Sequence, residues 1–159
     1  HFTGTHWRRV LRGPRFANGV AVHHDRFYVI GSLDKTLDIH VRDPATGQVG
    51  RRLARLRFAA SPDNLLWGLA PDGRSDHSTL YTAGHPNRLK FMRAKFINPQ
   101  APSPSAVYRI RVRSHPARVE CLYADDGRQL SGSSVAILYR DDLYVGQMLR
   151  TGLYRISKK

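Results

Sequence analysis

Short apolar runs recur along the chain, and residues that favour turns separate them. Near the start, residues 20–22 and 27–31 flank a polar turn at 23–26, a pattern that predicts a β-hairpin. Residues 37–41 alternate between apolar and polar positions, and Asp43–Gly47 then has the proline and glycine that a turn requires. This part of the chain therefore predicts three short strands.

The same arrangement occurs twice more. The predicted strands are residues 65–70 and 79–84 around a turn at 71–73, residues 134–139 and 143–146 around a turn at 140–142, and a last strand at 153–156. Asn18 and Asn64 lie 46 residues apart at the entrances of the first two cycles, which is the length of a four-stranded propeller blade. A proline-rich loop at residues 87–105 is expected to separate the second and third cycles.

These cycles predict an all-β protein, and their common form favours a β-propeller over the alternative, a β-sandwich. Residues 1–159 are interpreted as one partial propeller domain with about three blades of a six-bladed ring. Three blades leave the ring open, with exposed edge strands. We therefore interpret the sequence as about half of a longer propeller.

The charge and composition restrict the possible functions less than the pattern of predicted strands does. The net charge is +14, which is compatible with an anionic partner. However, Arg109, Arg111 and Arg113 alternate with apolar residues, and Arg51–Arg57 is typical of an exposed strand or a loop edge. We therefore expect solvated surfaces and disfavour nucleic-acid binding. No apolar run approaches the roughly 20 residues of a membrane span, and we expect a soluble protein.

The single cysteine excludes an intramolecular disulfide and a cysteine-based zinc site. Cys121 lies in the apolar run Val119–Tyr123. A reactive thiol needs an electropositive and partly open environment. We therefore expect Cys121 to be buried and inert.

Asn18, Asp63 and Asn64 are the candidate metal ligands, because each places a side-chain oxygen at the entrance of a predicted strand. Calcium binds such oxygen donors and takes roughly six to eight of them. Three ligands are too few, so a site here requires others. The alternative for both segments is turn formation, because Asn and Asp side chains commonly stabilise turns.

Several short motifs occur in an order that resembles the C-terminal half of the serum paraoxonase/arylesterase family. They are Phe16-Ala17-Asn18-Gly19-Val20, Asp63-Asn64, Gly84-His85-Pro86-Asn87, Asn98-Pro99, Val107-Tyr108-Arg109-Ile110, Leu130–Ala136, Tyr144-Val145-Gly146 and Leu153-Tyr154. Each motif is weak alone, but their common order and spacing are specific. The resemblance covers residues 12–156.

The resemblance implies a six-bladed propeller with two calcium ions in its central tunnel, which hydrolyses small-molecule lactones, aryl esters and organophosphates. It implies that Asn18, Asp63 and Asn64 bind the catalytic calcium (Ca2+), and that Phe16, His85 and Ser134 line the substrate pocket. A metal ion of this kind would polarise an ester carbonyl and stabilise the developing oxyanion. The family also implies secretion, although the residues themselves leave the compartment open.

The chain departs from the family pattern in ways that affect function. A glutamate and another asparagine of the calcium shell, the second calcium site and a histidine pair belong to the N-terminal half of the family's propeller and have no counterpart here. Arg155 stands where the family has a cysteine for a ring-closing disulfide. We therefore expect this chain to depend on the missing N-terminal half and to be inactive alone.

Two alternative functions remain open from the sequence. One is a non-catalytic, propeller-derived binding module, and the other is a sugar-lactone hydrolase of the gluconolactonase-like class. The residues do not identify a catalytic acid, base or nucleophile, and they do not define the substrate.

Overall fold

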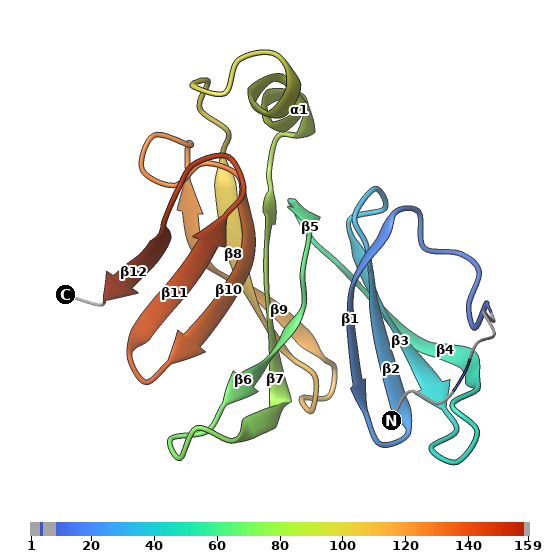
Figure 1. Ribbon diagram of the computed structural model, residues 1–159. Helices are drawn as coiled ribbons and strands as arrows, with labels where there is room; N and C mark the ends of the chain where they lie inside the picture. Colours follow the sequence, from blue (N-terminus) through green and yellow to red (C-terminus); the bar gives the residue numbers. More distant parts are fainter. Residues whose placement is uncertain (1–3, 5–8, 158–159) are drawn as a thin grey trace.

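The computed structural model describes residue 4 and residues 9–157, and in this part of the chain it has three antiparallel sheets and one helix. The sheets stand side by side in chain order, and they splay apart toward one end of the molecule (Figure 1). They do not close into a ring. The prediction of an all-β, partial β-propeller is confirmed.

The first sheet is a four-stranded meander with the order β1-β2-β3-β4. Its strands are β1 (Ala17–His23), β2 (Arg26–Gly31), β3 (Thr36–Arg42) and β4 (Val49–Arg57). The predicted hairpin is present, with His23 paired to Arg26 across its turn. The arginines of β4 are exposed, as their sequence pattern predicts.

The second sheet has the order β5-β7-β8-β9, with β6 also paired to β7. Its strands are β5 (Ser61–Pro62), β6 (Leu66–Leu69), β7 (Ser75–His85), β8 (Ser105–Arg111) and β9 (Arg118–Asp125). The long strand β7 pairs with β6 along its first part and with β5 at its end. This places the Asp63-Asn64 segment between the two short strands.

The third sheet has the order β10-β11-β12. Its strands are β10 (Ser133–Tyr139), β11 (Asp142–Gln147) and β12 (Leu153–Ser157), close to their predicted bounds. Both β1 and β10 contact β6 of the second sheet. The first strand of each outer sheet therefore lies against the same inner strand, as the inner strands of a propeller do.

Two apolar clusters hold the sheets together. The first joins sheets one and two through residues such as Ile30, Leu37, Leu80 and Ile110, which are fully buried. The second joins sheets two and three through a smaller set: Ala83, Val107, Leu130, Ala136, Leu143 and Val145. Because alternate residues of a strand face opposite sides, β8 contributes Ile110 to one cluster and Val107 to the other.

The expected proline-rich loop contains a helix, α1 (Arg88–Phe96), which the sequence pattern did not predict. Its N-cap, Asn87, accepts a hydrogen bond from the backbone N–H of Lys90 at 3.0 Å. Ala94 is its only buried residue, so the helix has no apolar stripe to reveal it. Capping and local propensity, rather than burial, account for this helix.

The expectation for Cys121 was wrong, because its side chain is exposed. Cys121 belongs to β9, the outermost strand of its sheet, which pairs only with β8. An edge strand can bury apolar side chains on one face while it exposes the other. Separately, within the described residues no helix has the length and apolar character needed to cross a membrane.

Candidate metal site at the inner strands

Asn18 lies at the start of β1, where the pairing with β2 is irregular. The register shifts between Ala17 and Val20, so Asn18 and Gly19 leave the regular ladder. The backbone N–H of Gly19 instead donates to the carbonyl oxygen of Asp63 at 3.0 Å. The irregular strand start therefore turns the first sheet toward the Asp63 segment of the second sheet.

Asp63 connects this strand start to β7. Its backbone N–H donates to the carbonyl oxygen of Ala83 at 2.9 Å. Its carboxylate accepts a hydrogen bond through Oδ1 from the side-chain amide of Asn18. The structure thus brings together two of the three predicted ligands, from different sheets.

Two glycines make this close approach possible. A Cβ on Gly19 would lie 2.7 Å from the carbonyl oxygen of Asp63, and a Cβ on Gly84 would lie 2.3 Å from that of Ser61. Neither glycine has the positive φ typical of turns. The glycine after Asn18 therefore permits close backbone contact with Asp63.

His85 lies against the same carboxylate. Its Nε2 is 3.8 Å from Oδ2 of Asp63, and the two residues are each only 7% exposed. The imidazole stacks on the ring of Phe91 with 3.7 Å between the ring centroids and an interplanar angle of 21°. Phe91 belongs to α1, so the unpredicted helix covers one side of the candidate site.

Asn64 extends the site toward the third sheet. Its backbone N–H donates to the carbonyl oxygen of Ser134 in β10 at 3.1 Å, while its side chain is exposed. Ser134 itself is half-buried. The third predicted ligand therefore follows directly after Asp63 and adjoins a predicted pocket residue.

Phe16, the remaining predicted pocket residue, directly precedes β1. Its side chain is 68% exposed, and its carbonyl oxygen accepts a hydrogen bond from the N–H of Ser32 at 3.1 Å. Its φ of 56° is in the left-handed region, which is uncommon for an aromatic residue. This conformation directs the chain into β1 two residues before Asn18.

Buried serines form hydrogen bonds to the backbone around the site, and the sequence pattern gave no sign of them. Ser32 donates to the carbonyl oxygen of Pro62 at 2.6 Å, and Ser133 donates to that of Gly84 at 3.3 Å. The N–H of Ser133 in turn donates to the hydroxyl of Ser105 at 3.0 Å. The role of a single serine cannot be predicted from the sequence, because it depends on a hydrogen-bond partner in a distant segment.

The donor set fits a hard divalent cation. Asp63 is a buried carboxylate, and in the described part of the chain the basic side chain beside it is the imidazole of His85 rather than an Arg or Lys. A buried carboxylate requires a compensating positive charge or several hydrogen bonds. The amides of Asn18 and Asn64 add neutral oxygen donors, which calcium accepts.

The protein's own groups form only part of such a site. Among residue 4 and residues 9–157, no three His, Cys, Asp or Glu side chains lie close enough together to hold a metal ion. Any calcium ion here would therefore depend on asparagine oxygens and on donors beyond this cluster. Three candidate donors fall well short of the roughly six to eight that calcium takes.

Comparison with known proteins relates this geometry to one group of sequences. A family model described as Arylesterase matches residues 1–156. Serum paraoxonase/lactonase 3 from Oryctolagus cuniculus is 28% identical over 165 residues, which cover 96% of this chain and 44% of that protein. The human serum paraoxonase/lactonase 3 is 30% identical over 146 residues, which cover 91% of this chain and 39% of the relative.

Human serum paraoxonase/arylesterase 1 is similar at the same level, with 28% identity over 155 residues that cover 97% of this chain and 41% of that protein. The chain thus spans about two fifths of the length of the curated relatives it matches. The resemblance drawn from the short motifs is confirmed.

Proposed function

Because the chain belongs to the arylesterase family, we propose that it provides one part of the active site of a calcium-dependent hydrolase for lactones or aryl esters. The relatives' names, which include paraoxonase, lactonase and arylesterase, support this class of substrate. The observation that carries the proposal is the contact of Asn18 with the buried carboxylate of Asp63.

Asn18, Asp63 and Asn64 are the proposed calcium ligands. When bound, the ion would polarise the carbonyl of an ester or lactone and stabilise the oxyanion that forms on attack by water. The anchoring of Asp63 to Gly19 and Ala83 supports the rigidity that such a site needs. The remaining oxygen donors are proposed to come from propeller blades outside this sequence.

His85 is proposed to line the substrate pocket and to orient Asp63. Its stack on Phe91 and its 3.8 Å approach to Oδ2 limit the positions that the imidazole can take. Ser134 and Phe16 complete the proposed pocket wall, the first beside Asn64 and the second at the entrance to β1. An exposed aromatic ring at this entrance suits the apolar part of an ester.

The word serum in the relatives' names supports a further proposal, that the protein acts outside the cell. Extracellular fluids supply millimolar calcium, which suits sites of modest affinity. The chain's departures from the family pattern, including Arg155, support the proposal that this part is inactive without its partner blades.

The test uses this chain together with the blades that are proposed to complete the propeller. We expect it to hydrolyse phenyl acetate and a δ-lactone, to lose that activity in EDTA and to regain it with calcium but not with magnesium. Asp63→Ala should abolish the calcium-restored activity, whereas Asp72→Ala, which removes an exposed carboxylate from the β6–β7 turn, should retain it. Hydrolysis that persists in EDTA, or that this chain catalyses alone without calcium, would overturn the proposal.

A further inference from the structure

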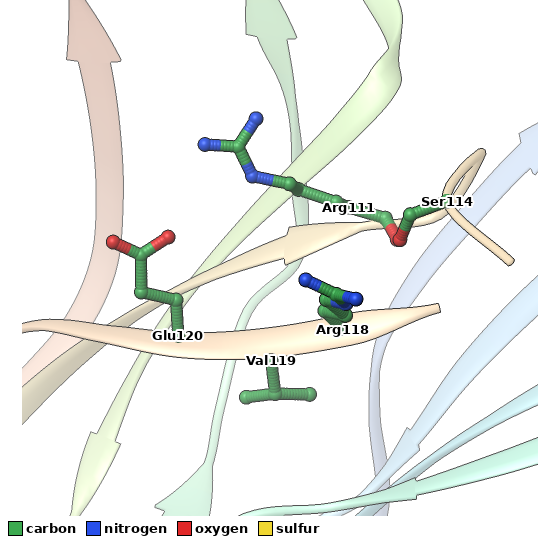
Figure 2. Close-up of a pocket in the computed structure, with 5 residues that line it drawn as sticks. All are labelled: Arg111, Ser114, Arg118, Val119 and Glu120. Carbon is green, nitrogen blue, oxygen red and sulfur yellow. The ribbon is translucent and has the colours of Figure 1, made fainter. Parts of the chain in front are cut away.

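A pocket of about 510 Å³ lies on the β8–β9 hairpin, in a different part of the molecule from the proposed calcium site. It is lined by Arg111, Ser114, Arg118, Val119 and Glu120. Figure 2 shows Arg111, Arg118 and Glu120 on one side of the hairpin, with Val119 directed to the other side. Three of the five lining residues are therefore charged, and they share one face of the hairpin.

Arg111 and Arg118 occupy directly opposite positions in the ladder, as the last residue of β8 and the first of β9. Both are exposed. Directly opposed like charges destabilise a strand pair. The hairpin therefore brings two arginine side chains to opposite positions of one strand pair, at an electrostatic cost that a bound anion would remove.

The neighbouring cross-strand pair leaves this positive charge in place. Arg109 donates to Oε2 of Glu120 through Nε at 3.1 Å and Nη2 at 2.8 Å. Three arginines and one glutamate thus share this face of the hairpin, which leaves an excess of two positive charges. An excess of two matches the charge of a phosphate or sulfate dianion.

The end of the hairpin is fixed by its own hydrogen bonds. The hydroxyl of Ser114 lies 2.9 Å from the carbonyl oxygen of Arg111 and 3.0 Å from that of Pro116. The N–H of Val112 donates to the carbonyl oxygen of Ser78 in β7 at 3.0 Å. The backbone positions from which Arg111 and Arg118 project are therefore held before any ligand binds, which favours affinity.

We propose that Arg111 and Arg118 form a binding site for the phosphate or sulfate group of a small molecule. Guanidinium groups match the oxygens of such anions through paired hydrogen bonds. The pocket is larger than a bare oxyanion and has the size of small-molecule sites, so an organic part fits beside the charged group. Nucleic acid fits less well, because it requires a continuous basic stripe, and Glu120 interrupts this one.

The test measures binding of inorganic phosphate to the chain by amide NMR shifts at constant ionic strength. We expect shifts concentrated at residues 111–120, and an increase in Kd of at least about tenfold in Arg111→Ala and Arg118→Ala. Arg118→Lys keeps the charge but loses the fork, so its Kd should fall between those of the parent and Arg118→Ala. Arg74→Ala removes the same charge from the exposed β6–β7 turn and should bind phosphate as the parent does.

Equal loss of binding in Arg74→Ala and Arg118→Ala would overturn the proposal, because the effect would then come from net charge alone. Shifts spread over all the arginines would do the same. Two further probes distinguish the sources of the anion. Phenyl phosphate should bind more tightly than inorganic phosphate, whereas preferential binding to phosphatidylcholine vesicles containing phosphatidate would contradict a small-molecule ligand.

Discussion

Asn18 at the start of the first sheet donates a side-chain hydrogen bond to Asp63 in the second sheet, and this contact joins two segments that are far apart in the chain. The same carboxylate lies beside His85, which belongs to the end of β7. Polar groups from β1, β7 and the segment after β5 therefore converge at the inner strands. The proposed calcium site depends on this convergence and on the backbone that permits it.

Gly84 is the position at which the backbone leaves the least room for a side chain. In Gly84→Ala the new Cβ would lie 2.3 Å from the carbonyl oxygen of Ser61, so β5 must move away from β7. We expect the free energy of unfolding in urea to fall by about 1–3 kcal/mol, the usual cost of overpacking. Gly50→Ala is the matched control, since its Cβ would meet atoms no nearer than 3.9 Å and should change stability little. Equal stability of the two variants would contradict the close β5–β7 contact.

Asp38 provides a second test, in the first sheet. Its buried carboxylate accepts hydrogen bonds from Nε and Nη2 of Arg55 at 2.6 and 2.7 Å. Burial alone would raise the pKa of Asp38, but the Arg55 hydrogen bonds and charge outweigh it, and the pKa is lowered. Asp38→Ala should cost about 1–2 kcal/mol, reduced because Arg55 is partly hydrated.

The lowered pKa of Asp38 also predicts a pH dependence. The stabilisation should be complete above the unfolded pKa of about 3.9 and should decline as the pH falls toward the folded value. Asp126→Ala, which removes an exposed pair with Arg128, should change stability by less than about 1 kcal/mol. Urea unfolding at pH 7 and pH 3.5 measures both effects, and a similar loss in the two variants would exclude a special role for Asp38.

The strands were predictable because they alternate between apolar and polar residues and end in turn residues. The β1–β2 hairpin around His24 and Asp25 and the β10–β11 hairpin follow this pattern directly. Helix α1 was not predictable from periodicity, because only Ala94 is buried and the rest of its surface is exposed or half-buried. The environment of Cys121 was not predictable either, because the sequence does not tell an edge strand from a central one.

Part of the candidate site was also predictable from the repeated strand pattern. Asn18 and Asp63 could be identified because each marks the entrance of a repeated unit, and the structure brings them into contact. The stack of His85 on Phe91 could not be identified, since it depends on a helix that no pattern indicated. Sequence periodicity thus locates residues on strands, but contacts made by a loop insertion require the structure.

The stacked imidazoles of His23 and His77 predict a response to mild acid. The rings belong to different sheets, and their centroids are 4.0 Å apart at an interplanar angle of 18°. The pKa of His23 is lowered by burial and by the charges of His77, His24 and Arg113, against a smaller opposing effect of Asp25. The neutral form of the His23 ring is therefore favoured in the folded protein.

Stability should consequently be complete above the unfolded pKa of about 6.5 and should decrease as the pH falls through the lowered folded value, because the unfolded chain binds the proton first. We expect His77→Asn to reduce the difference in unfolding free energy between pH 7.5 and pH 5.5, and to raise the pKa of His23 measured by NMR. His115→Asn removes an exposed imidazole outside this pair and should leave the difference unchanged. An unchanged difference in His77→Asn would show that the stack does not respond to pH.

The central claim, that Asp63 binds calcium, can be measured directly on this chain by thermal unfolding with and without calcium. A ligand present at about ten times its Kd stabilises the folded state by about 1.4 kcal/mol, which corresponds to a rise in Tm of about 3–6 °C. We predict such a rise in 10 mM calcium, about ten times a millimolar Kd, for the parent chain and for Asp72→Ala, which loses only an exposed carboxylate. No rise should occur in Asp63→Ala. An equal rise in Asp63→Ala and the parent would contradict the claim.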